Sequence, residues 1–230
     1  MKYQILAGVL ALLLVFAGSF NASADIRIPE ENCIGQSGAS VALSVCYPRF
    51  GVPAIDEDIR SWAEGLATQF SQRYGRESIP PSHVPYQLAA DYRAVRSPYG
   101  PISVVWKIAR YTGSGLGKIE VFSANYESLT GTPLSLLDIF GSLEDALADI
   151  AAYVQPRIEH RLEGACAAGY NADGLGPEAD NYGTFAVTSS GLRFYFQPGQ
   201  VAPPQCGVLT QDVPLAVFRK CLPDTHLWRR

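Results

Sequence analysis

Two stretches of this chain repeat apolar residues at every third or fourth position, and the segments between them repeat apolar residues at every second position. The helical spacing runs from Ile55 to Tyr74 and again from Leu143 to Leu162, which indicates two amphipathic helices. The alternating spacing covers residues 86–92, 102–108 and 118–126, and short turns between them are typical of an antiparallel meander. The sequence therefore predicts an α+β fold, a mostly antiparallel sheet with two amphipathic helices packed on it.

The segments around these helices have less regular sequence patterns. Residues 25–37 are expected to form an irregular lead-in, and residues 164–183 a loop rich in glycine, alanine and asparagine. Ser142 is expected to cap the second helix, and Pro156 to kink or split it because its nitrogen cannot donate to the preceding turn. Four further strands are predicted, at residues 39–47, 184–188, 192–196 and 213–218.

The N-terminus has the three-part layout of a secretory signal. Lys2 supplies a positive charge, the segment from Ile5 to Phe20 is almost continuously apolar, and Ala22 and Ala24 form an A-x-A cleavage site before Asp25. A retained membrane anchor is the alternative, but the apolar run is shorter than the ~20 residues that span a bilayer. We therefore predict a signal peptide at residues 1–24, a periplasmic or secreted product, and no membrane span once the signal is removed.

The remaining residues, 25–230, have the length and composition of one globular domain. The chain is 47% hydrophobic and 17% charged, and no flexible linker interrupts it, so we predict a single domain with subdomains at roughly 38–130 and 131–221. Loss of the signal removes Lys2 and no acid, which moves the formal net charge from −4 to −5. An acidic balance of this kind argues against nucleic acid as a partner, because nucleic acid requires a basic face.

Cysteine usage indicates disulfide bonds. An exported chain meets an oxidising compartment, and no C-x-x-C pair is present that would favour zinc. Cys166 with Cys206 is the first choice, because both flank loops beside the final strands, and the partners in a second pair stay open. No metal site is predicted. The five cysteines that are candidates for disulfide bonds are Cys33, Cys46, Cys166, Cys206 and Cys221.

Two glycine-rich stretches imitate ligand-binding motifs without completing them. In residues 112–118 (TGSGLGK), Thr112 replaces the first glycine of a phosphate-binding loop and Ile119 replaces its final serine or threonine, so a hairpin turn is the better interpretation. Residues 169–180 match several positions of a calcium loop, but Gly169 stands where the first acidic ligand belongs. We therefore predict no cofactor.

No catalytic constellation is visible in the sequence. It contains neither G-x-S-x-G nor H-E-x-x-H, and Asp56 and Asp58 are most simply explained as acids at a helix start. The histidines, His83, His160 and His226, are scattered and have no partner at a telling spacing. No catalytic residue is therefore predicted.

Two segments carry a resemblance to a known family. Asn125–Phe140 (NYESLTGTPLSLLDIF) and Gly191–Gly207 (GLRFYFQPGQVAPPQCG) each place a turn after a strand-like run, and Val41–Phe70 fits the N-terminal half of the same family domain. Together they resemble the extracellular domain of RsiV-type anti-sigma factors and of PdaC-type cell-wall deacetylases, over roughly Val41 to Arg219. Family members often carry a histidine in the glycine-rich turn, where this chain has Leu116.

This resemblance implies an exported, non-enzymatic binding module of the cell envelope. In the family the domain recognises lysozyme or lies near the cell wall, so the expected partner is an envelope protein or cell-wall component, with lysozyme as the first candidate. The sigma-binding segment of RsiV-type proteins and the Asp/His motifs of the deacetylase half are absent from this sequence. The alternative is a cell-wall hydrolase or deacetylase-associated enzyme whose site is assembled only in three dimensions.

The proposed contact surface is the loop from Gln197 to Cys206. Its prolines hold an extended backbone that has little conformational entropy left to lose on binding. The other interpretation, that these prolines only route the chain between strands, stays open. The predicted partner-binding residues are Pro198, Gln200, Pro203, Pro204 and Gln205.

Overall fold

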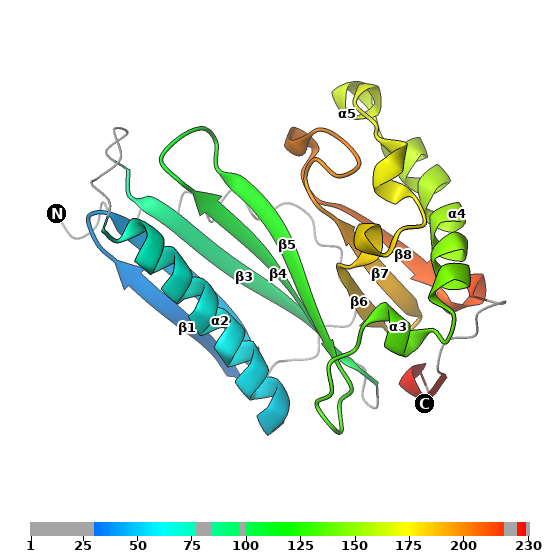
Figure 1. Ribbon diagram of the computed structural model, residues 1–230, viewed down its shortest axis with the longest axis horizontal. Coiled ribbons are helices and arrows are strands. Elements are labelled where there is room, and N and C mark those ends of the chain that lie inside the picture. Colours follow the sequence, from blue (N-terminus) through cyan, green and yellow to red (C-terminus); the bar gives the residue numbers. More distant parts are fainter. Residues whose placement is uncertain (1–29, 77–83, 97–99, 219–224, 229–230) are drawn as a thin grey trace.

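The computed structural model describes residues 30–76, 84–96, 100–218 and 225–228. These residues form two sheets, one of five strands in the order β1-β2-β3-β4-β5 and one of three strands in the order β6-β7-β8 (Figure 1). The predicted α+β class is confirmed. The strands are β1 Glu30–Ser37, β2 Val41–Arg49, β3 Tyr86–Arg96, β4 Ile102–Tyr111, β5 Lys118–Tyr126, β6 Phe185–Thr188, β7 Gly191–Phe196 and β8 Leu209–Pro214. The helices are α2 Pro53–Tyr74, α3 Leu136–Ile139, α4 Leu143–Arg161 and α5 Gly164–Ala168, with short 3-10 turns η1 Ala172–Leu175, η2 Ala179–Tyr182, η3 Pro204–Cys206, η4 Leu215–Val217 and η5 Thr225–Trp228.

The five-stranded sheet contains the predicted meander. β3, β4 and β5 pair antiparallel in sequence order, while β2 and β3 pair parallel, with α2 as the long crossover that a parallel pair requires. The irregular lead-in predicted for residues 25–37 is wrong over residues 30–37, which form β1 and pair antiparallel with β2. This strand depends on its neighbour and not on local β propensity, and residues 25–29 lie outside the described part of the chain.

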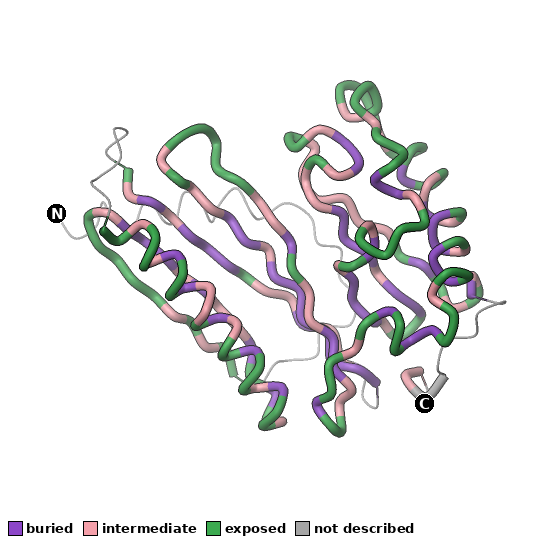
Figure 2. Tube along the Cα trace, viewed as in Figure 1, coloured by how far each residue is buried: buried purple, intermediate pink, exposed green. Residues whose placement is uncertain are grey.

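The first core lies between α2 and this sheet, as the buried segments in Figure 2 show. On α2, Ile55, Ile59 and Ala63 are fully buried at the spacing of one helical face. Trp62 of α2 also reaches β5, where its ring stacks on Phe122 with the centroids 5.1 Å apart. The apolar residues at helical spacing therefore form the face of α2 that packs on the sheet.

The second core lies between α4 and the three-stranded sheet. α4 buries Ile150, Val154 and Ile158 and continues through Pro156 to Arg161, so the predicted split is not observed. The proline ring is exposed, and apolar burial on both sides of it offsets the ~3 kcal/mol that a proline costs inside a helix. Ser142 occupies the predicted N-cap position, although its hydroxyl bonds to the side chain of Asp145 and not to a backbone amide.

Two other predictions in this half are corrected. The segment predicted as a loop at residues 164–183 contains α5, η1 and η2. The strand predicted at residues 213–218 instead covers Leu209–Pro214 and ends at a proline, whose nitrogen cannot donate to a sheet ladder. Among the described residues, none of the helices combines the length and the apolar character that a membrane crossing requires.

The two sheets meet edge to face. β6 is the outer strand of its sheet, and its backbone groups bond to polar side chains that stand on the face of β4 and β5. The N–H of Phe185 donates to Ser123 Oγ (3.0 Å), the N–H of Val187 donates to Ser103 Oγ (2.9 Å), and the carbonyl of Phe185 accepts from Asn125 Nδ2 (3.1 Å). These side chains satisfy groups that an uncovered strand edge would leave unpaired.

Candidate functional site

The loop predicted to bind a partner is fixed by internal bonds. The amide Nε2 of Gln200 donates to the carbonyls of Gly174 (2.9 Å) and Asn181 (3.0 Å), and its Oε1 accepts from the backbone N–H of Gln197 (3.0 Å). The predicted Cys166–Cys206 disulfide is confirmed and ties the end of the loop to α5. The side chain of Gln200 therefore holds the loop in place.

The other predicted contact residues differ in exposure. Pro204 and Gln205 are exposed, whereas Pro198 and Pro203 are half-buried. Pro203 packs so closely on Gly169 that a Cβ at that glycine would lie 2.3 Å from its Cγ. The loop thus presents Pro204 and Gln205 to solvent on a rigid support.

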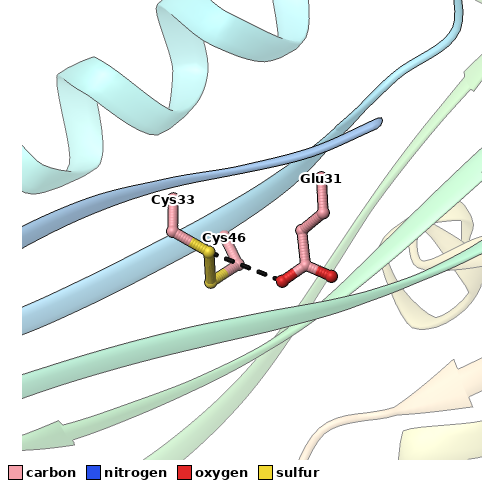
Figure 3. Close-up of side chains that lie close together, drawn as sticks. All are labelled: Glu31, Cys33 and Cys46. Atoms are coloured by element: carbon pink, nitrogen blue, oxygen red, sulfur yellow. Dashed lines mark hydrogen bonds between the residues drawn. A yellow bond between two sulfur atoms is a disulfide. The ribbon is translucent and has the colours of Figure 1, made fainter. Parts of the chain in front are cut away.

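A second disulfide joins the first two strands. Cys33 and Cys46 are cross-strand partners with their Cα atoms 4.1 Å apart, and Glu31 Oε1 lies 3.5 Å from the Cys33 sulfur (Figure 3). These three side chains cluster as metal ligands do. The sulfurs are bonded to each other, however, and a disulfide offers no thiolate to a metal. Cys221 lies outside the described residues.

Of the three histidine side chains, the structure describes that of His160. His160 is exposed near the C-terminal end of α4, His83 lies outside the described residues, and nothing is described of the His226 side chain. Asp56 accepts hydrogen bonds from the backbone N–H groups of Phe50 (2.7 Å) and Gly51 (2.9 Å), which fixes the turn before α2.

A cleft of about 460 Å³ lies between the two sheets, with α3 and the segment before it along one side. Its size falls in the range of ligand pockets, roughly 300–1,000 Å³. Two of its apolar side chains face solvent: Leu137 is 61% exposed and Phe122 is 39% exposed. The lining residues are Asp58, Phe122, Ser123, Ala124, Asn125, Tyr126, Pro133, Leu134, Ser135, Leu136, Leu137, Leu143, Ala179, Gly183 and Phe185.

The titratable groups that line this cleft are Asp58 and Tyr126, and they bond to each other. The Tyr126 hydroxyl donates to Asp58 Oδ2 at 2.7 Å. Burial, and next the hydrogen bond to the Asp58 carboxylate, raise the pKa of Tyr126 well above its usual value of 10.0. The phenol thus stays protonated at neutral pH, and the pair links α2 to β5 in a fixed arrangement.

The wall around Leu137 is built by a capped turn of helix. Ser135 and Asp138 form a reciprocal capping box at the start of α3, in which the N–H of Ser135 donates to Asp138 Oδ2 at 2.7 Å. Hydrogen bonds from the Ser135 side chain and backbone hold the pKa of Asp138 below its usual value of 3.8. Because α3 buries Leu136 and Ile139, the intervening Leu137 faces the cleft.

This cleft was not predicted from the sequence. Leu137 belongs to the apolar cluster LSLLDIF, so its hydrophobicity was visible, but the sequence gives no sign that this leucine is exposed. The other walls come from Asp58, Phe122 and Phe185, which are far apart along the chain. A pattern within one short stretch of sequence cannot show that residues so far apart lie together.

Solved structures with a similar fold indicate the class of protein. Over 89% of its length, this chain superposes on a DUF3298 family protein from Pseudomonas aeruginosa PAO1, with a TM-score of 0.63, 14% identity and 98% of that chain covered. A DUF3298 family member from Bacteroides fragilis matches over 84% of this chain and 93% of its own, with a TM-score of 0.54 and 16% identity. At these identities the likeness concerns the fold.

The sequence comparisons agree with this fold. Residues 137–216 match the family described as Protein of unknown function (DUF3298). The chain is 21% identical over 192 residues to the peptidoglycan-N-acetylmuramic acid deacetylase PdaC of Bacillus subtilis, a match that covers 83% of this chain and 41% of the deacetylase. It is also 24% identical to the immunogenic protein MPT64 of Mycobacterium tuberculosis, over 96% of this chain and the full length of that protein.

These matches confirm a resemblance to the DUF3298 family and to the deacetylase PdaC. The chain spans less than half of the deacetylase, so that enzyme's activity belongs to a protein of more than twice the aligned length. The two disulfides are compatible with an extracellular location.

Proposed function

We propose that this protein is an exported, non-enzymatic binding module of the cell envelope, and that the cleft beside α3 is its main contact site. The proposal rests on the chemistry of the residues that line the cleft. Phe122 and Leu137 expose apolar side chains in it, and its titratable pair, Asp58 and Tyr126, is joined by an internal hydrogen bond. Apolar surface of this kind contributes binding energy by leaving water, about 25 cal/mol for each Å² buried.

An enzyme needs a different arrangement. General acid–base chemistry needs a group whose pKa lies near the working pH, with access to a reacting atom. The pKa of Tyr126 is moved away from neutrality, and its proton is committed to Asp58. These facts favour binding over the alternative of a cell-wall hydrolase or deacetylase-associated enzyme.

The proposed partner is an envelope protein or cell-wall component, and lysozyme is the first candidate because of the family resemblance. The relative named as a peptidoglycan deacetylase also supports a location near the wall. The exposed residues of the rigid loop, Pro204 and Gln205, form a second proposed contact, since a fixed backbone loses little entropy on binding.

Calorimetric titration with hen-type lysozyme and sedimentation with purified peptidoglycan test this function. Leu137→Glu should weaken binding at least tenfold, because it places a charge in the apolar cleft. Leu129→Glu is the matched control, since Leu129 is 88% exposed and does not line the cleft, and it should change affinity less than twofold. Replacing Pro203 and Pro204 with glycine should weaken binding by loosening the loop, while His160→Ala should leave it unchanged.

Two results would reject the proposal. One is the absence of binding to both lysozyme and peptidoglycan. The other is release of acetate or soluble wall fragments by the purified protein, if that activity is lost in Asp58→Asn, which would establish the enzyme alternative.

A further inference from the structure

β5 is one of the two outer strands of the five-stranded sheet, and its outer edge faces the cleft. The direction of its backbone groups follows from one contact. Both the N–H and the C=O of Val121 bond to the side-chain amide of Gln197, at 2.8 and 2.6 Å, and therefore point away from β4. Backbone groups alternate along an antiparallel strand, so those of Ser123 and Asn125 point to the same outer side.

The edge is paired on both sides of a short gap. On one side the carboxamide of Gln197 covers Val121, and on the other the N–H of Leu134 donates to the carbonyl of Asn125 at 2.8 Å. Between these contacts lie the N–H and C=O of Ser123 and the N–H of Asn125. Within the described part of the chain, no hydrogen bond is found for these three groups.

We propose that this gap takes an extended peptide segment of a partner protein, which adds to β5 as a short strand. The inference deepens the proposed function and rests on it, because it specifies what the cleft binds. The chemistry of the edge favours a peptide: the groups that already pair with β5, the Gln197 carboxamide and the Leu134 backbone, are both amides. The gap offers a donor, an acceptor and a donor in a fixed row, which the backbone of an extended peptide complements at the same spacing.

The side chains of the cleft fit the same occupant. A bound strand directs alternate side chains to opposite faces, and Leu137 and Phe122 provide exposed apolar surface beside the edge. The paired positions at both ends limit the added strand to about three or four residues, at roughly 3.3 Å each. A partner segment rich in β-branched residues and without proline at the bonding positions matches these limits.

Amide hydrogen exchange measured by NMR on the purified full chain tests this inference. The probe is the peptide acetyl-Lys-Val-Thr-Val-Thr-Val-Lys-amide at millimolar concentration. Exchange at Ser123 and Asn125 should slow at least tenfold when the peptide binds, because both amides then donate to it. The same peptide N-methylated at alternate residues on its bonding edge should bind at least tenfold more weakly, because its side chains are kept and its donors are lost.

Two variants separate the backbone of Ser123 from its side chain. Ser123→Pro removes the outward N–H, and Ser123→Ala removes only the hydroxyl that bonds to Phe185. Peptide affinity should be at least tenfold lower in the proline variant than in the alanine variant. If the proline variant does not fold, the N-methylated peptide supplies the same comparison on the intact protein.

Several results would overturn the inference: no binding of the peptide, binding with exchange at Ser123 and Asn125 unchanged, protection confined to the opposite edge strand β1, or equal binding of the N-methylated peptide. Protection of Ser123 by peptidoglycan oligosaccharides, with no effect of peptide, would assign the cleft to glycan instead. If Leu137→Glu abolishes lysozyme or peptidoglycan binding while Ser123→Pro does not, the proposed function stands and strand addition fails. If the peptide protects Ser123 and Asn125 but neither envelope probe binds, strand addition stands and the proposed function fails.

Discussion

Ser103→Ala tests whether the two sheets depend on the hydroxyl groups between them. Ser103 is fully buried, and its Oγ accepts the N–H of Val187 in β6, which is itself 3% exposed. Alanine removes the acceptor and leaves a buried donor without a partner, at a cost of about 1–3 kcal/mol. The free energy of unfolding should therefore fall by about 1–3 kcal/mol, and each kcal/mol should lower Tm by about 2–4 °C in a domain of this size.

Urea unfolding followed by tryptophan fluorescence measures this change. Ser123→Ala removes the equivalent bond to Phe185 at a half-buried position, so water can partly replace the hydroxyl and the loss should be smaller. Ser114→Ala, in an exposed turn, should change stability by less than about 0.5 kcal/mol. A loss below about 0.5 kcal/mol for Ser103→Ala would refute the reasoning, because the amide of Val187 would then have another partner.

Three further predictions concern disulfides, acid and export. Replacing Cys166 and Cys206 together with alanine should lower the free energy of unfolding by about 4 kcal/mol, measured by urea titration, because the bond closes a loop of 40 residues. The pKa of Asp138 is depressed by its bonds, so its contribution to stability is present above its usual value of 3.8 and is lost as pH falls below it. Thermal unfolding should accordingly show a smaller loss between pH 6 and pH 3 in Asp138→Asn than in the natural chain. Intact mass of the exported protein should place its first residue at Asp25, and a mass that retains residues 1–24 would contradict the predicted signal peptide.

The elements that the sequence predicted correctly are those with a local pattern. Apolar residues at helical spacing marked α2 and α4, because each helix buries one face on its own sheet. β1 was missed because its sequence, EENCIGQS, contains one β-branched residue, and its strand conformation depends on pairing with β2. Pro156 shows a similar limit of prediction from local sequence. A proline does cost stability inside a helix, but the burial of apolar residues on both sides of it keeps α4 continuous.

The site was less predictable because its contacts are long-range. The sequence predicts that Gln200 contacts a partner, and the bonds of its amide to Gly174 and Asn181 link segments that lie far apart along the chain. The open edge at Ser123 follows from the positions of Gln197 and Leu134 on either side of it, and the sequence contains no sign of that arrangement. Pairing of this kind is set by topology, which local periodicity does not encode.

The edge-to-face contact between the sheets favours one order of assembly. The outer strand β6 bonds to Ser103, Ser123 and Asn125, and these side chains point to one face only after β4 and β5 have paired. In a chain that emerges N-terminus first, β4 and β5 become available for pairing before β6. If the C-terminal half folded first, β6 would present an uncovered edge that other chains can join. Variants that slow pairing of β4 with β5 should therefore increase aggregation during refolding, even where the native state is little changed.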